Sequence, residues 1–234
     1  MTIAVADVAG ALERVLDRVA DAGGDPEAVT VVAVTKGFGP EAPLAALGAG
    51  LVELGENYAQ ELQEKAAAVA SGGGLPAPRW HFIGRLQSNK VRTVAEHVAC
   101  WQSLDRASVV DEVAKRAPGA QVLVQVNAAD EDGKGGATLE GTPELVARAR
   151  DAGLDVAGLM AVGVAGDDAA TEAAFVATTA MADRLELPVR SLGMSGDLAA
   201  AVRAGTTMIR VGTALFGPRP APGGSRNPPP DLRD

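Results

Sequence analysis

Lysine is scarce in this chain, so the position of each lysine is informative. Five of the 21 basic residues are lysines, and the others are arginines. Lys36 ends the apolar run Val29–Thr35, and the period-2 alternation of a strand would place it on the face of Val32 and Val34. A lysine flanked in this way can be desolvated, which lowers the pKa of its amine and frees it to act as a nucleophile. A solvated lysine at the end of a strand is the alternative.

Two glycine-containing turns near the C-terminus could hold a phosphate. Ser195-Gly196 opens a helical pattern, and Gly212-Thr213 follows the last apolar run. Backbone N–H groups and hydroxyls in such turns bind phosphate without many cations. A phosphate-bearing aldehyde could place its phosphate on these turns and its aldehyde on Lys36, as a Schiff base. Pyridoxal 5′-phosphate is the obvious candidate.

Arg210 is the next residue of interest, because it shares a strand face with Met208 and Gly212. If Gly212 faces the phosphate, Arg210 faces the same side. An arginine against a pyridine nitrogen keeps that nitrogen unprotonated and makes the cofactor a poorer electron sink. Pairing of Arg210 with an acidic side chain inside the fold, such as Glu53, is the alternative, and both interpretations stay open at this point.

The elements that position these residues alternate between short apolar runs and amphipathic stretches. Several of the apolar runs are nearly continuous Val, Ile, Leu and Ala, which is typical of parallel strands covered on both faces. The eight runs are Val29–Thr35, Leu51–Leu54, Trp80–Ile83, Ala99–Leu104, Gln121–Val126, Val156–Val162, Val189–Leu192 and Thr207–Val211.

Seven amphipathic stretches separate the runs, and an eighth helical pattern, with Val8 and Val15 on one face, precedes the first run. One stretch begins at Thr142-Pro143, which predicts Thr142 as the helix cap. The predicted fold is a single α/β domain, 1–217, that forms a (β/α)8 TIM barrel with the N-terminal helix completing the outer ring. An open doubly wound sheet is the alternative. The seven stretches are 40–49, 57–70, 88–97, 106–116, 142–151, 168–185 and 196–204.

In such a barrel, active sites lie at the C-terminal ends of the strands, and phosphate often binds after the seventh and eighth strands. Lys36 and the two glycine turns would therefore meet at one mouth. The remaining segment, 218–234, contains six prolines and no apolar period, so we expect a disordered tail.

Composition excludes several classes of protein. The net charge of −9 argues against a general nucleic-acid binder, and a single cysteine excludes an intrachain disulfide framework. Cys100, His81 and His97 are too few for a four-ligand zinc site. No apolar run is long enough to span a membrane, and the N-terminus lacks a basic leader. We expect a cytoplasmic protein that is monomeric.

Long motifs across the chain resemble those of the pyridoxal phosphate homeostasis proteins, which are single-domain relatives of the alanine racemase N-terminal barrel. The motifs keep their order over nearly the whole predicted domain. They are VVAVTK (31–36), GENYAQE (55–61), WHFIGRLQSNK (80–90), GLMAVG (158–163), LGMSGDL (192–198) and IRVGTALFG (209–217).

The resemblance implies a fold-type III barrel with pyridoxal phosphate on Lys36. It implies that Ser195, Gly212 and Thr213 hold the phosphate and that Arg210 meets the pyridine nitrogen. It also places Asn57 close to the ring substituents and Met160 under the ring, although a core methionine is the alternative for Met160. The resemblance includes Lys90 and Lys134, which could serve phosphate or surface electrostatics. His81 is interpreted as a hydrogen-bonded barrel residue, since no carboxylate partner is visible nearby in the sequence.

The resemblance implies a function without catalysis: a protein that buffers free pyridoxal phosphate and could deliver it to apoenzymes. A small amino-acid racemase is the alternative. A racemase needs a second acid–base group opposite the lysine, and the only tyrosine, Tyr58, lies in the GENYAQE segment. An aldolase-like enzyme that uses Lys36 without a cofactor would explain the phosphate turns but not the motifs.

Overall fold

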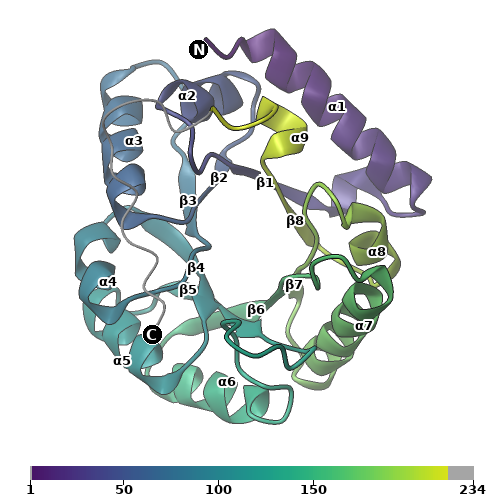
Figure 1. Cartoon of the computed structure of the whole chain (residues 1–234). Coiled ribbons are helices and arrows are strands. Elements are labelled where there is room, and N and C mark those ends of the chain that lie inside the picture. The colour runs from purple at the N-terminus through teal and green to yellow at the C-terminus, as the bar shows by residue number, and fades with distance from the viewer. Residues whose placement is uncertain (1, 221–234) are drawn as a thin grey trace.

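Eight parallel strands close into a barrel in chain order, with β1 hydrogen-bonded to both β2 and β8. The computed structural model describes residues 2–220, and Figure 1 looks along the barrel axis. The predicted (β/α)8 barrel is therefore confirmed, and the open doubly wound sheet is wrong. The strands are β1 (Thr30–Val34), β2 (Glu53–Glu56), β3 (Arg79–Phe82), β4 (Val98–Leu104), β5 (Gln121–Val126), β6 (Asp155–Ala161), β7 (Val189–Ser191) and β8 (Met208–Val211).

Helices surround the barrel and bury the outward-facing strand residues. Ala33 and Ile209 are fully buried against this helical layer, whereas Met160 belongs to a separate cluster inside the barrel. The helices are α1 (Val5–Asp21), the 3₁₀ turn η1 (Pro26–Ala28), α2 (Glu41–Gly48), α3 (Ala59–Ser71), α4 (Ser88–Val94), α5 (Ala107–Arg116), α6 (Thr142–Asp151), α7 (Asp168–Arg184), α8 (Leu198–Arg203) and α9 (Thr213–Phe216).

The N-terminal helix α1 completes the outer ring, as the sequence predicts. It packs between α2 and α8 and also contacts the one-turn helix α9 (Figure 1). Its buried face carries Val8, Val15 and Val19 at helical spacing. The helix that completes the outer ring thus comes from the N-terminal end of the chain.

Two local predictions are wrong. Thr142 is the first residue of α6 rather than its cap: Gly141 is in the cap position, and the Thr142 hydroxyl donates to the Thr138 carbonyl oxygen instead. Strand β2 continues to Glu56 although the apolar run stops at Leu54. The Glu56 carboxylate at this buried strand end is paired with the Lys65 amine. The predicted disordered tail lies outside the described residues from residue 221 on.

Candidate functional site

Lys36 lies at the C-terminal mouth of the barrel, two residues beyond β1, with its side chain partly buried. Burial lowers the pKa of its amine, and the positive charges of Arg219 and Arg210 lower it further. The carboxylates of Glu56 and Glu61 act in the opposite direction. The predicted desolvated lysine is therefore present, and at neutral pH more of its amine is unprotonated than in a solvated lysine.

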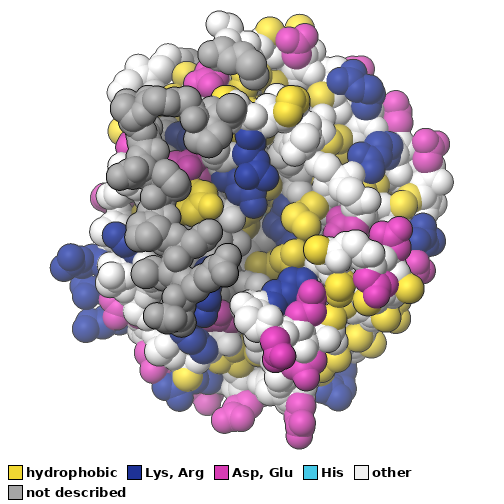
Figure 2. Space-filling view, in the orientation of Figure 1, with side chains coloured by type: hydrophobic (Ala, Val, Ile, Leu, Met, Phe, Trp, Pro, Cys, Tyr) yellow, Lys and Arg dark blue, Asp and Glu magenta, His cyan; other side chains and the backbone are white. Residues whose placement is uncertain are grey.

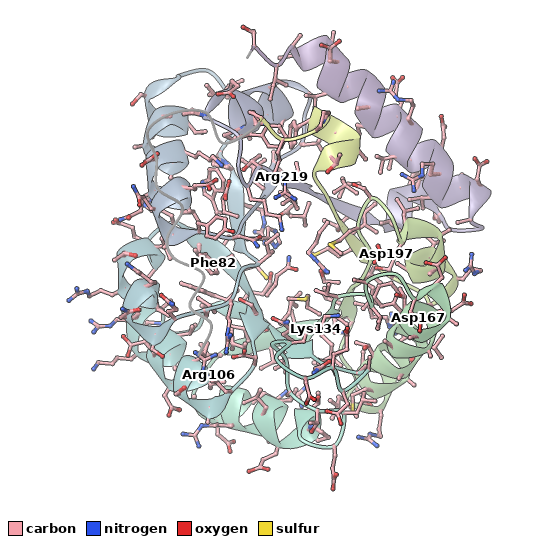
Figure 3. All side chains as sticks on the ribbon, viewed as in Figure 1. Phe82, Arg106, Lys134, Asp167, Asp197 and Arg219 are labelled. Atoms are coloured by element: carbon pink, nitrogen blue, oxygen red, sulfur yellow. The ribbon has the colours of Figure 1, made fainter. Side chains whose placement is uncertain are left out.

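Two cations from the C-terminal part of the described chain lie near Lys36. Arg210 belongs to β8, and Arg219 follows α9 and points to the mouth (Figure 3). A side chain at Gly37 would meet the Arg219 Cδ atom at 2.9 Å, so Arg219 packs over this glycine. In the space-filling view, Lys and Arg side chains gather around the central hollow (Figure 2). The mouth is locally cationic in a chain whose net charge is −9.

The two predicted phosphate turns lie side by side at this mouth. The Ser195 hydroxyl accepts a hydrogen bond of 3.2 Å from the Ala214 backbone N–H. Thr213 is exposed at the first position of α9, and Gly212 precedes it. The turn after β7 is thus tied to the helix start after β8, and both present backbone N–H groups and a hydroxyl.

The packing of β8 against β1 also explains why position 212 is a glycine. A Cβ there would lie 2.9 Å from the Val34 carbonyl oxygen, so only glycine lets the end of β8 approach β1 this closely. Gly212 therefore also serves the contact between β8 and β1.

Arg210 is fully buried and donates to uncharged acceptors. Its Nη1 lies 2.6 Å from the Ser191 carbonyl oxygen and 2.7 Å from the Ser191 Oγ, and its Nη2 lies 2.7 Å from the Ala161 carbonyl oxygen. Burial lowers the pKa of the guanidinium to about 10. The alternative in which Arg210 pairs directly with Glu53 is not observed.

Arg210 is instead linked to Glu53 through a chain of hydrogen bonds inside the barrel. The Ser191 Oγ donates to Gln102 Oε1 at 2.8 Å, and Gln102 Nε2 lies 2.6 Å from His81 Nδ1. His81 Nε2 lies 2.6 Å from Glu53 Oε2. Because an amide nitrogen can only donate, His81 accepts at Nδ1 and carries its proton at Nε2.

His81 is therefore the hydrogen-bonded barrel residue that the sequence predicts, and its carboxylate partner is distant in the sequence. Glu53 lies on the neighbouring strand, 28 positions earlier. Burial tends to raise the pKa of Glu53, whereas hydrogen bonds from His81 and Arg79 lower it overall. Only the register of β2 against β3 reveals this pair.

Asn57 and Met160 are placed differently with respect to the mouth. Asn57 follows β2, and its Oδ1 is buried without a hydrogen-bond partner among the described residues. Met160 is buried inside the barrel and packs in a small cluster with Cys100 and Leu123. Met160 is thus a barrel-core residue, and its contact with a ring above it stays a prediction.

Sequence reasoning missed a buried charged network behind β1 and β2, which we call the outer network: Glu56, Glu61 and Lys65. Lys65 is 2% exposed, although lysine is among the residues most rarely buried. Its amine lies 2.5 Å from Glu56 Oε1 and 2.8 Å from Glu61 Oε2. The scarcity of lysine, together with the i,i+4 spacing of Glu61 and Lys65, could have indicated this network.

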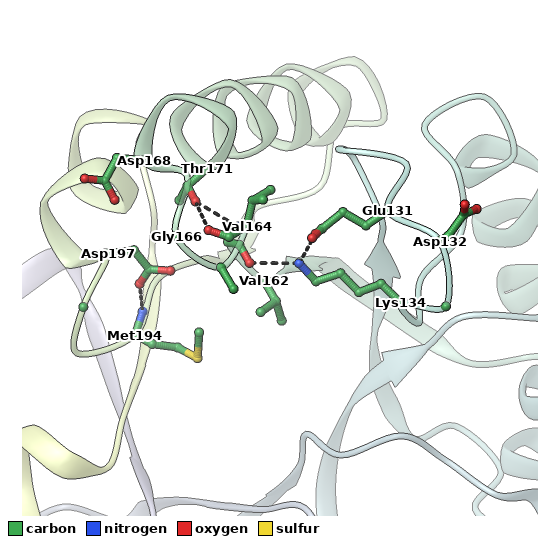
Figure 4. A pocket seen from close by; sticks show the side chains of 14 residues that line it. Glu131, Asp132, Lys134, Val162, Val164, Gly166, Asp168, Thr171, Met194 and Asp197 are labelled. Carbon is green, nitrogen blue, oxygen red and sulfur yellow. Dashed lines mark hydrogen bonds and ion pairs between the residues drawn. The ribbon is translucent and has the colours of Figure 1, made fainter. Parts of the chain in front are cut away.

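Beside the mouth, a cavity of about 660 Å³ opens between the loops after β5, β6 and β7 (Figure 4). Lys134 lies in it, paired with Glu131 and 2.9 Å from the Gly163 carbonyl oxygen. Asp197 lies on the opposite wall and accepts from the Met194 N–H. Lys90, the other lysine that the motifs include, is exposed on α4.

The described residues contain no group of three or more metal-ligating side chains. No helix among them has the length and apolar character that crossing a membrane requires. Tyr58 is 51% exposed at the start of α3, and Cys100 is buried inside the barrel.

Comparison with known proteins gives consistent results. The family model "Alanine racemase, N-terminal domain" matches residues 9–220. A pyridoxal phosphate homeostasis protein of Escherichia coli K12 is 38% identical, over 91% of this chain and 97% of the relative. One of Pseudomonas aeruginosa is 37% identical, over 94% and 97% of the two chains.

Solved structures show the same fold. PipY of Synechococcus elongatus PCC7942, solved with pyridoxal phosphate bound, is 28% identical with a TM-score of 0.74, covering 87% of this chain and all of PipY. Alanine racemase of Corynebacterium glutamicum shares the fold at 16% identity and a TM-score of 0.67, over 96% of this chain but 64% of the racemase. The chain belongs to the alanine racemase N-terminal domain family and, within it, to the pyridoxal phosphate homeostasis proteins.

Proposed function

We propose that this protein binds pyridoxal 5′-phosphate at the barrel mouth, with the cofactor linked to the Lys36 amine, and that it buffers the supply of this cofactor. The observation that carries the proposal is the position of a desolvated lysine on the same mouth as the joined turns of Ser195 and Thr213. Membership of a family whose relatives are named pyridoxal phosphate homeostasis proteins supports it.

The residues present fit this cofactor. Asn57 Oδ1 is a buried acceptor without a partner, and an unpaired buried acceptor is costly unless a ligand satisfies it. Ser195 and Thr213 offer the phosphate two hydroxyls, and Gly212 and Thr213 carry backbone N–H groups at the start of α9. Arg210 is held by carbonyl and hydroxyl oxygens, so its orientation is fixed before the ring arrives.

When bound, the cofactor supplies an aldehyde that can bond to an amine. Lys36 provides that amine, and burial with the nearby arginines keeps part of it unprotonated. Arg210, which stays a hydrogen-bond donor, would meet the ring nitrogen without giving it a proton. This arrangement disfavours carbanion chemistry compared with an aspartate partner.

We propose that the protein does not catalyse a reaction. His81 is engaged by Glu53 and Gln102 inside the barrel and is not available as an acid–base group at the mouth. Tyr58 is half exposed to solvent. The racemase alternative needs a second acid–base group close to the lysine, and neither residue is placed for this role.

The recipients of the cofactor in this proposal are apoenzymes that require pyridoxal phosphate, and the protein acts in the cytoplasm as a monomer. The monomer is supported by the scatter of the large exposed apolar side chains. They lie at separate places in the described chain: in α1, at the start of α3, in the loop after α3 and in α7. They are Val5, Tyr58, Leu75 and Val176.

The test of this proposal is borohydride reduction of the purified protein with pyridoxal phosphate. We expect one reduced cofactor per chain, attached to Lys36, and none on the variant Lys36→Ala. The exposed lysine variant Lys115→Ala is the matched control and should label as the parent does. Full labelling of Lys36→Ala would contradict the assignment. Exchange of the α-proton of D- or L-alanine above background would contradict the absence of catalysis.

A further inference from the structure

The outer network contacts the backbone immediately before Lys36. The Lys65 amine donates to the Thr35 carbonyl oxygen at 2.7 Å, and the Thr35 hydroxyl donates to Glu56 Oε1 at 2.5 Å. Thr35 is fully buried and lies on the helix side of β1, whereas Lys36 follows on the side of the mouth. The residue before Lys36 is therefore fixed through both its backbone and its side chain.

The same network contacts the backbone immediately after Lys36. Glu61 Oε2 accepts from the Gly37 N–H at 2.9 Å and from the Lys65 amine at 2.8 Å. One carboxylate oxygen on α3 thus joins Gly37 to Lys65, which itself holds Thr35. Lys36 lies between two residues that a single connected set of charges holds in place.

Stability alone does not explain this network. Removing Lys65 and Glu56 from water costs several kcal/mol per ion, and apolar residues of similar volume often stabilise a core as well or better. Burial raises the pKa of Glu56 despite the nearby Lys65, and Glu56 Oε2 has no hydrogen-bond partner among the described residues. Such a costly arrangement next to the reactive lysine indicates a role at the mouth.

The network also sets part of the charge around Lys36. The charged groups that act on the Lys36 amine are Arg219 after α9, Arg210 on β8, Glu56 on β2 and Glu61 on α3. Through the carboxylates of Glu56 and Glu61, the outer network raises the pKa of Lys36, whereas the two arginines lower it. It therefore offsets part of the effect of burial and of the arginines on Lys36.

We propose that Glu61 and Lys65 are positioning residues for Lys36: they hold the residues on both sides of it, and the Glu61 carboxylate adds a negative charge that acts on its amine. The inference rests on the proposed function only in treating Lys36 as the residue that binds the cofactor. Glu61 and Lys65 act from behind the strand and do not touch the cofactor in this proposal.

The test uses ¹³C-lysine-labelled full-length protein freed of cofactor, so it does not depend on cofactor binding. Glu61→Gln keeps an oxygen that can accept from Gly37 and Lys65, because both bonds go to the same atom, and removes the charge. We expect the titration midpoint of the Lys36 Cε resonance to fall by about 0.5 to 1 pH unit. Glu64→Gln removes a carboxylate from the exposed face of the same helix. This control should shift the Lys36 midpoint by less than about a quarter of the change in Glu61→Gln.

The positioning role has a separate readout. In Glu61→Ala, which loses the acceptor, we expect the Gly37 amide to exchange with solvent about ten times faster or more, whereas Glu61→Gln keeps it protected. Lys65 is tested without substitution: its ammonium protons should exchange far more slowly than those of Lys115. A midpoint that is unchanged or raised in Glu61→Gln would overturn the charge role. Unaltered Gly37 exchange in Glu61→Ala, or fast exchange of the Lys65 ammonium, would overturn the positioning role.

Discussion

Two polar networks support the mouth, and they use different physical means. The outer network lies between the strands and α3 and consists of charged side chains that contact each other directly. The inner chain runs through the barrel from Arg210 to Glu53 and places two neutral side chains and a histidine between the charged ends. One supports the lysine of the mouth, and the other supports its buried arginine.

The difference teaches what each residue requires. In the proposed function the Lys36 amine is partly unprotonated, and burial together with nearby charges sets its proton equilibrium. Arg210 must keep its orientation, and neutral hydrogen bonds fix an orientation without changing a charge. Each donor of the inner chain points away from Arg210 towards Glu53, so that the bonds polarise one another in the same direction.

The largest expected effect follows from breaking the outer network. Lys65→Met should lower the free energy of unfolding by about 3 to 5 kcal/mol, because it leaves Glu56 buried without its charged partner. Chemical denaturation monitored by circular dichroism measures the change.

Two further variants make this prediction specific. Lys115→Met on the exposed face of α5 should change stability by no more than about 0.5 kcal/mol. Lys65→Met combined with Glu56→Gln should recover part of the loss, since the charge that remains, Glu61, is partly exposed to solvent. A double variant that is no more stable than Lys65→Met would show that packing, and not charge, dominates at this position.

Breaking the inner chain should have a smaller effect, because its central members are neutral. Gln102→Leu removes the bonds to His81 Nδ1 and the Ser191 hydroxyl and should cost about 1 to 3 kcal/mol for the groups left unpaired. Gln121→Leu, at the partly exposed start of β5, is the control and should stay within about 0.5 kcal/mol of the parent protein. If Gln102→Leu destabilised the protein more than Lys65→Met, the distinction between the two networks would fail.

The sequence predicts the scaffold of both networks. Apolar runs separated by amphipathic stretches predict the barrel, because strands that are covered on both faces consist mainly of Val, Ile, Leu and Ala. The observed bounds of β5 and α6 are the predicted ones, Gln121–Val126 and 142–151. Lys36, Ser195 and Thr213 could be assigned to one mouth because strand direction alone puts their positions at the same end of a parallel barrel.

The networks themselves could not be predicted in this way. Hydrophobic patterning expects charged residues at the surface, so the buried Glu56 and Lys65 contradict the rule on which the assignment of elements rests. The contact between Gln102 and Ser191 joins residues 89 positions apart across the barrel interior. It depends on register and barrel closure, which local periodicity does not contain.

The smallest expected effect concerns the apolar layer inside the barrel, where Cys100 packs against Leu123 and Met160. Burial, the largest cause, raises the pKa of its thiol to about 12, so the native protein should react with an aromatic disulfide at pH 8 about a thousand times more slowly than the urea-unfolded chain. The thiol loses its proton near pH 8.5 in the unfolded chain and near the raised value in the folded one. Its contribution to stability is therefore complete below about pH 8.5 and is lost as the pH rises through the folded value. Rapid labelling of the native protein at pH 8 would mean that the interior opens to solvent, and an open interior could not keep the neutral inner chain oriented beneath Arg210.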